Sequence, residues 1–75
     1  MIALASAKNG DSGTVAALKT NDESTIRKLM AMGVIPGMPI VLEQRFPSYI
    51  IKVGKTRAAI DHEIAQTIYI QKLAS

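Results

Sequence analysis

The sequence predicts a mainly β fold, a small barrel of about five antiparallel strands with one inserted α-helix and a short corner helix. Short runs of alternating apolar and polar residues are separated by turn residues, and one run has helical periodicity instead. In a chain of 75 residues these short strands cannot bury both faces of an open sheet. Curling into a barrel stabilises such strands and protects their edges. We therefore predict one domain over residues 1–75.

The composition limits the classes to which the protein can belong. There is no cysteine, so disulfides and thiolate metal ligands are excluded. No run approaches the ~20 apolar residues of a membrane span, and the N-terminus lacks the basic region of a signal peptide, so we expect a soluble, cytoplasmic protein. The net charge is +3, and the nine lysines and arginines are scattered. This pattern is more typical of a solubilising surface than of a nucleic-acid interface.

The first third of the chain is predicted to contain one strand. Residues 4–7 form either a short edge strand or a lead-in, and residues 8–13 are rich in turn formers, which predicts a tight loop. Residues 14–19 have enough β-character for a strand.

One helix is predicted from about residue 22 to residue 32. Residues 20–24 supply capping and acidic side chains for its N-terminus. Ile26, Leu29 and Met30 recur with helical spacing, so we expect them to face the core. Met32 lies off that face and is expected to be exposed.

A glycine and a Pro-Gly pair follow the helix. Gly33 lies where a left-handed conformation commonly ends a helix. Pro36 and Gly37 fit the two central positions of a type II turn, which sends the chain into the next strand.

The rest of the chain is predicted to form a meander and a closing strand. Strands are expected over residues 38–45, 49–53 and 56–60, with turns at 46–48 and 54–55. Alternation places Ile40, Leu42 and Gln44 on one face of the first strand. On the second strand it places Tyr49, Ile51 and Val53 on one face. Asp61 is expected to cap a one-turn corner helix, and residues 67–71 to form the last strand.

The segment 27–37, Arg-Lys-Leu-Met-Ala-Met-Gly-Val-Ile-Pro-Gly, resembles the R-x-L-x-x-x-G-[I/V/L]-x-P-G signature of the FeoA domain family, named for ferrous iron transport protein A. Leu29, Gly33, Pro36 and Gly37 are the structural positions of that motif. Similar glycines and aliphatic residues precede and follow it: Leu4, Ala7, Gly10, Gly13, Val15, Leu18, Val53, Gly54, Ala59, Ile60, Ala65, Ile68 and Ile70. The resemblance covers nearly the whole chain. The turn at residues 46–49 departs from it, because the family often has a longer, glycine-bearing connection there.

The resemblance implies an SH3-like barrel without catalysis or a cofactor of its own. It also implies a role in ferrous iron uptake, as an interaction module on the cytosolic side of a membrane transporter (FeoB) whose G domain hydrolyses GTP. The same module is similar to the C-terminal domain of certain metal-dependent repressors, which leaves a metal-responsive regulatory module as an alternative. An edge strand of such a barrel could also pair with a second copy of the chain.

Neither a metal site nor an enzyme active site is predicted. Asp61, His62 and Glu63 are the only metal-ligand types in a row, but consecutive residues of a helix do not share a face. His62 is the sole histidine, and no serine has a nucleophile signature around it. Transition-metal binding is therefore a property of the family that these residues do not support.

We expect a partner to bind the outer face of the helix together with the turn at residues 46–49. An exposed, flexible methionine beside cations suits an adaptable protein surface, and exposed aromatic residues do too. The candidate partner-binding residues are Arg27, Lys28, Met32, Phe46, Tyr49 and Arg57. The alternative is a small nucleic-acid-binding barrel, in which Arg45, Phe46, Tyr49 and Arg57 would cluster at one hairpin end.

Overall fold

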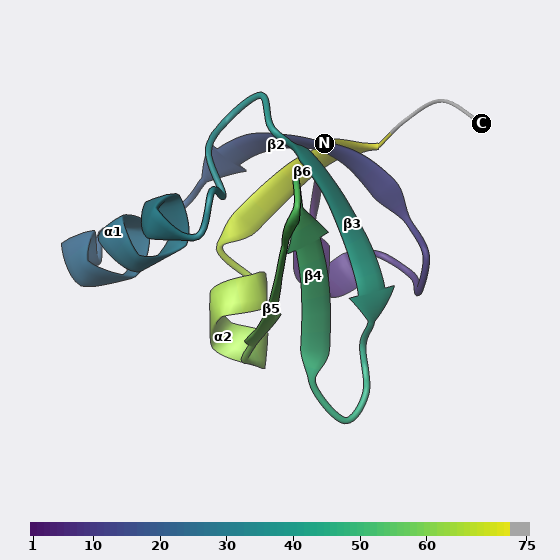
Figure 1. Cartoon of the computed structure of the whole chain (residues 1–75). Coiled ribbons are helices and arrows are strands. Elements are labelled where there is room, and N and C mark those ends of the chain that lie inside the picture. Colours follow the sequence, from purple (N-terminus) through teal and green to yellow (C-terminus); the bar gives the residue numbers. More distant parts are fainter. Residues whose placement is uncertain (73–75) are drawn as a thin grey trace.

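A computed structural model describes residues 1–72 and has a six-stranded antiparallel sheet in the order β1-β6-β2-β3-β4-β5 (Figure 1). The strands are β1 (Ile2–Ala3), β2 (Ser12–Leu18), β3 (Pro39–Gln44), β4 (Tyr49–Val53), β5 (Thr56–Ile60) and β6 (Ile68–Lys72). The helices are the 3-10 helix η1 (Leu4–Ser6), α1 (Glu23–Ala31) and the one-turn α2 (His62–Ala65). The predicted mainly β architecture with one inserted helix and a corner helix is confirmed.

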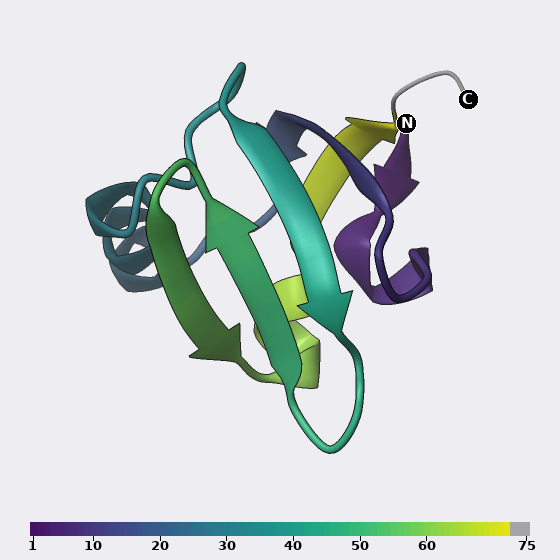
Figure 2. The same ribbon diagram turned by 45° about the vertical axis from the view of Figure 1, so that its right-hand side comes forward.

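The sheet curls on itself (Figure 2). Helix α2, which follows β5, packs against η1, which follows β1. Two irregularities help it bend, since a bulge increases the local twist of a strand. One lies between Val15 and Ala17 where β2 pairs with β6, and the other between Leu42 and Gln44 where β3 pairs with β4. The second bulge makes one prediction wrong: Gln44 lies opposite Ile50, on the outer face, rather than beside Leu42.

The N-terminus differs slightly from the prediction. A two-residue strand, β1, pairs with β6, and the predicted strand or lead-in at residues 4–7 is mostly the helix η1. Leu4 is fully buried, so this segment closes one end of the core.

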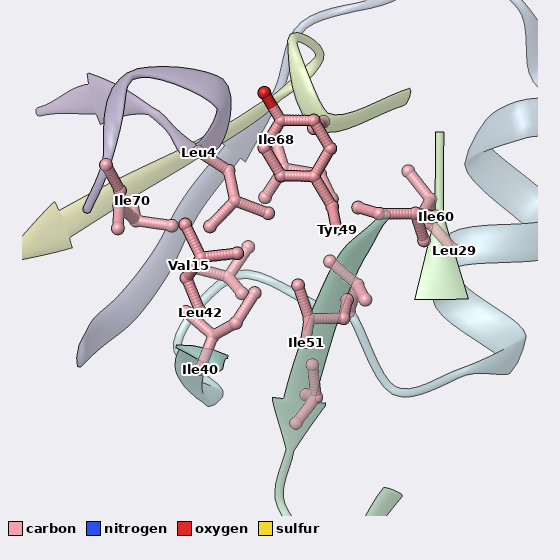
Figure 3. Packing of buried hydrophobic residues seen from close by; sticks show 14 residues of the cluster. Leu4, Val15, Leu29, Ile40, Leu42, Tyr49, Ile51, Ile60, Ile68 and Ile70 are labelled. Carbon is pink, nitrogen blue, oxygen red and sulfur yellow. The ribbon is translucent and has the colours of Figure 1, made fainter. Parts of the chain in front are cut away.

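One aliphatic cluster fills the barrel (Figure 3). Its large, fully buried side chains come from η1, the strands, α1 and the connection after α1: Leu4, Val15, Leu29, Val34, Ile40, Leu42, Ile51, Ile68 and Ile70. The predicted alternation is confirmed for Ile40 and Leu42 of β3 and for Tyr49, Ile51 and Val53 of β4, because each set is buried on one side of its strand.

Helix α1 begins and ends as the sequence predicts. The Asp22 carboxylate accepts hydrogen bonds from the Ser24 backbone N–H (3.0 Å) and the Thr25 hydroxyl (2.9 Å). At the other end Gly33 has a φ of +91°, and its N–H donates to the carbonyl of Met30 (3.0 Å). The Val34 N–H donates to the carbonyl of Leu29 (2.9 Å), which completes a Schellman motif.

The Pro-Gly corner is attached directly to the barrel. The Met38 N–H donates to the Ile35 carbonyl (3.0 Å) and Gly37 has a φ of +96°, as a type II turn requires. The Gly37 N–H also donates to the Val15 carbonyl (2.7 Å), and the Val15 N–H donates to the Met38 carbonyl (2.9 Å). The corner thereby joins the C-terminus of α1 to β2 and fixes where β3 begins.

Candidate protein-interaction surface

The exposure of two methionines at the C-terminal end of α1, Met30 and the C-cap residue Met32, is the reverse of what was predicted. Met30, predicted to be core, is 47% exposed, whereas Met32, predicted to be exposed, is half-buried against the core. The buried arc of α1 is centred on Leu29, and ideal helix geometry places Ile26 and Met32 about 60° to either side of it and Met30 about 100° away. Met32 therefore packs inward, and Met30 takes its place as the exposed methionine.

Four residues form one flank of α1: Glu23, Ile26, Arg27 and Met30, called the α1 surface from here on. They are three or four residues apart, so their side chains are neighbours on the helix. Glu23, Ile26 and Arg27 line an open hollow of about 350 Å³. The Arg27 guanidinium lies only loosely against Glu23, at 4.0 Å, and its side chain is 77% exposed. Both charges are therefore available to a partner.

Lys28 lies next to this surface. It is exposed, and it is the basic residue in the last turn of α1, where a cation interacts favourably with the helix dipole. The exposed Met30 and the partly exposed Ile26 thus have cationic neighbours. Such a combination of a flexible thioether, an aliphatic side chain and charges at the rim suits an adaptable protein contact.

The β3–β4 turn exposes one aromatic side chain. Phe46 is 85% exposed, as a partner-binding aromatic would be. Tyr49, which the sequence groups with it, is only 7% exposed, so its predicted place on this surface is wrong. Alternation along β4 explains the difference, because Tyr49 shares the inner face with Ile51 and Val53.

The Tyr49 hydroxyl has a local partner inside the molecule. It lies 3.0 Å from Nδ1 of His62, and the Arg45 guanidinium lies 5.9 Å from the centre of the Tyr49 ring. Arg45 also donates a hydrogen bond to the Ala5 carbonyl (2.9 Å). These contacts tie β3, β4, α2 and η1 together, so Tyr49, Arg45 and His62 have structural roles here.

Arg57 is exposed but paired. Its Nε donates to Oε1 of Glu43 (2.6 Å) and its Nη2 to Oε2 (3.1 Å), a two-point ion pair across the outer face of the sheet. The hydrogen bonds from Arg57 lower the pKa of Glu43, and the same bonds raise the pKa of Arg57. A ligand that recruits Arg57 must therefore compete with Glu43.

The structure does not bring the predicted residues together into one surface. α1 and the β3–β4 turn lie at different ends of the molecule in both views (Figures 1 and 2). Arg27 and Lys28 are on α1, Met32 is half-buried at its C-cap, Phe46 is on the turn, and Arg57 is on β5. The nucleic-acid alternative also loses support. Two residues of its proposed cluster are not available, since Tyr49 is buried and Arg57 is paired with Glu43.

The sequence did not lead us to predict that Met30 and Ile35 are exposed. Ile35, which immediately precedes the Pro-Gly corner, is 40% exposed. The signal for Met30 was present in the helical spacing, since centring the buried arc on Leu29 rather than on Ile26 would have placed it outside.

Across residues 1–72, no group of three or more histidine, aspartate or glutamate side chains could hold a metal ion. No helix within the same residues is long and apolar enough to cross a bilayer.

A family model described as the FeoA domain matches residues 2–72. Among solved structures, the chain is similar to an iron uptake regulatory protein (FeoA), with 30% identity, 96% of each chain covered and a TM-score of 0.86. It is also similar to the zinc-complexed FeoA of Stenotrophomonas maltophilia (18% identity, TM-score 0.82, 95% of this chain and 91% of that one), which is described as an SH3 domain protein and a candidate ferrous iron transport activating factor.

A manganese-dependent transcriptional repressor has the same fold over part of its length. Its identity to this chain is 22% and its TM-score 0.86, with 93% of this chain and 40% of the repressor covered. No curated protein sequence matches the chain. The predicted SH3-like barrel is confirmed.

Proposed function

The chain belongs to the FeoA domain family, and from this premise we propose that it is a non-enzymatic accessory protein of ferrous iron uptake. It acts on the cytosolic side of a membrane GTPase iron transporter of the FeoB type. Its part is to bind the transporter's cytosolic domain, not to hold iron.

The α1 surface is the observation that favours this function. α1 projects from the barrel and is attached to it through Leu29 and the Schellman motif, so its flank is free to enter a groove of a partner (Figure 1). Met30 and Ile26 supply apolar contact area beside the hollow, and Arg27 and Glu23 supply charges at its rim. A central apolar contact with a polar rim is the usual organisation of a protein–protein interface.

The side chains that acid–base chemistry would need are engaged in structural contacts, which supports a non-enzymatic role. Nδ1 of His62 lies against the Tyr49 hydroxyl, and Asp61 caps α2 by accepting from the Ile64 N–H (2.7 Å).

Ferrous iron uptake by cells that lack the chain tests the proposal. The wild-type protein should restore transporter-dependent uptake, and the variant Arg27→Glu with Met30→Asp should not, because it reverses the charge and places a carboxylate in the apolar centre of the α1 surface. Both residues are exposed, so the fold should remain; circular dichroism checks this.

A matched control changes an exposed cation and an exposed apolar residue elsewhere. Lys52→Glu with Phe46→Asp makes the same change in charge and also replaces an exposed apolar side chain by aspartate, at residues outside the α1 surface. It should restore uptake like the wild type. Full uptake with the α1 variant, or no effect of the wild-type chain, would overturn the proposal.

A further inference from the structure

Within residues 1–72, the outer edge of β5 has no strand partner. β5 is the last strand in the sheet order and pairs only with β4, through a two-residue turn in which Val53 lies opposite Thr56 (Figure 2). In such a hairpin the residues next to the turn exchange hydrogen bonds, and pairing then alternates along the strand. The N–H and C=O groups of Thr56, Ala58 and Ile60 therefore face β4, and those of Arg57 and Ala59 face away.

The free edge lacks most of the features that usually protect an edge strand, and its one charged side chain, Arg57, is already paired with Glu43. It contains no proline, its pairing with β4 has no register shift, and it is a full strand of five residues. Arg57 and Ala59 are exposed, and no other element of residues 1–72 makes a backbone hydrogen bond to either. Four backbone groups of one edge are thus available for strand addition.

The length and sequence of β5 favour a second copy of the same strand as the occupant. Antiparallel pairing about a two-fold axis at Ala58 aligns the two strands over their whole length, with Thr56 opposite Ile60 and Arg57 opposite Ala59. The outward-facing groups of Arg57 and Ala59 then meet those of the partner. Each copy gives and receives hydrogen bonds, and only the small Ala58 side chains meet at the axis.

Charge complementarity supports the same arrangement. The register about Ala58 places Lys55, in the β4–β5 turn, opposite Asp61 of the other copy at both ends of the paired strands. It also keeps the two Arg57 side chains out of direct opposition, and each is already neutralised by its own Glu43. A register centred on Arg57 would place two guanidinium groups opposite each other, which is unfavourable.

We infer that the free edge of β5 is a self-association site, at which two copies of the chain join their sheets antiparallel about Ala58. The interface is small, so the dimer is weak and its population depends on concentration. This inference does not depend on the iron-uptake proposal, because none of its residues belongs to the α1 surface.

Sedimentation velocity over a range of concentrations and amide hydrogen exchange by NMR test the inference together. As the dimer forms, the Arg57 and Ala59 amides should become protected from exchange. The Ala58 amide is the internal reference, since it is bonded to β4 in monomer and dimer alike. A chain that stays monomeric at millimolar concentration, or that dimerises with the Arg57 and Ala59 amides unprotected, would overturn the inference.

Two variants test whether the outer edge of β5 is the dimer interface. Ala59→Pro removes an N–H that faces away from β4, so it should abolish dimerisation while the monomer still folds. Lys55→Glu places a carboxylate opposite Asp61 and should weaken dimerisation about tenfold. Lys52→Glu is the matched control, because it makes the same charge change on β4 and should leave dimerisation unaltered. Equal weakening by both lysine variants would also contradict the inference.

Discussion

Gly13 lies where β2 approaches β6 so closely that a side chain does not fit. A Cβ at this residue would overlap the backbone carbonyl of Gln71, which cannot move without disturbing the strand pairing. We expect Gly13→Ala to lower the free energy of unfolding by about 3 kcal/mol. Urea denaturation measures the change. Gly10→Ala is the control: Gly10 has a φ of +87° but open space around it, so only the conformational cost of about 1 kcal/mol should appear.

Asp22 makes the stability of α1 depend on pH. The Ser24 hydroxyl, the Thr25 hydroxyl and the Ser24 amide donate hydrogen bonds that lower the pKa of Asp22 below its usual 3.8. The folded state therefore favours the ionised carboxylate. The stability that this carboxylate contributes is complete above pH ~4 and is lost as the pH falls through the lowered pKa. Asp22→Asn keeps a capping side chain without this titration.

Comparing unfolding of the wild type and Asp22→Asn at pH 7 and pH 3 tests this effect. The stability difference between the two proteins should shrink as the pH falls. A difference that stays constant between the two pH values would show that the Asp22 charge contributes nothing.

Residue-scale errors in the sequence analysis have one common cause. Periodicity identified the buried stripe of α1 but not its centre, so Met30 and Met32 were exchanged. Similarly, alternation predicted that Gln44 shares a face with Ile40 and Leu42, but the bulge after Leu42 moved Gln44 to the other side of β3. Both outcomes depend on tertiary packing and strand register, which a single sequence encodes only indirectly.

The two residues of the Pro-Gly corner are expected to contribute unequally to the free energy of unfolding. Gly37 has a φ of +96° and no atom near its missing Cβ, so Gly37→Ala should cost about 1–2 kcal/mol through backbone strain alone. Pro36→Ala keeps the turn geometry available and should cost less than about 1 kcal/mol. Urea denaturation separates the two. An equal cost for both variants would mean that the left-handed conformation of Gly37 is not the constraint.

Helices, strands and turns could be predicted where neighbouring residues in the sequence determine the local conformation. The ends of α1 follow from Asp22 and Gly33, the turns from proline and glycine, and the meander from alternating side chains. The placement of β1 against β6 was not predictable in this way, because it joins the two ends of the described chain and depends on closing the sheet. The approach of α2 to η1 has the same long-range origin.

At the scale of the whole molecule, two exposed regions serve different purposes in our account. The α1 surface is proposed to bind the transporter, and the β5 edge to bind a second copy. The sequence alone suggested a single surface that combined α1 with the β3–β4 turn. The figures show these at different ends, and Tyr49 is a core residue. Which exposed residues are neighbours depends on the complete fold, so this part of the site could not be derived from spacing.

Titration calorimetry of the chain against the isolated cytosolic G domain of a FeoB-type transporter tests the central claim most directly. We predict saturable binding by the wild type and by Lys52→Glu with Phe46→Asp. Arg27→Glu with Met30→Asp should bind at least about tenfold more weakly, as expected when the apolar centre of an interface and a rim charge are lost. Equal binding by both variants, or no binding by the wild type at any nucleotide state of the G domain, would contradict the account.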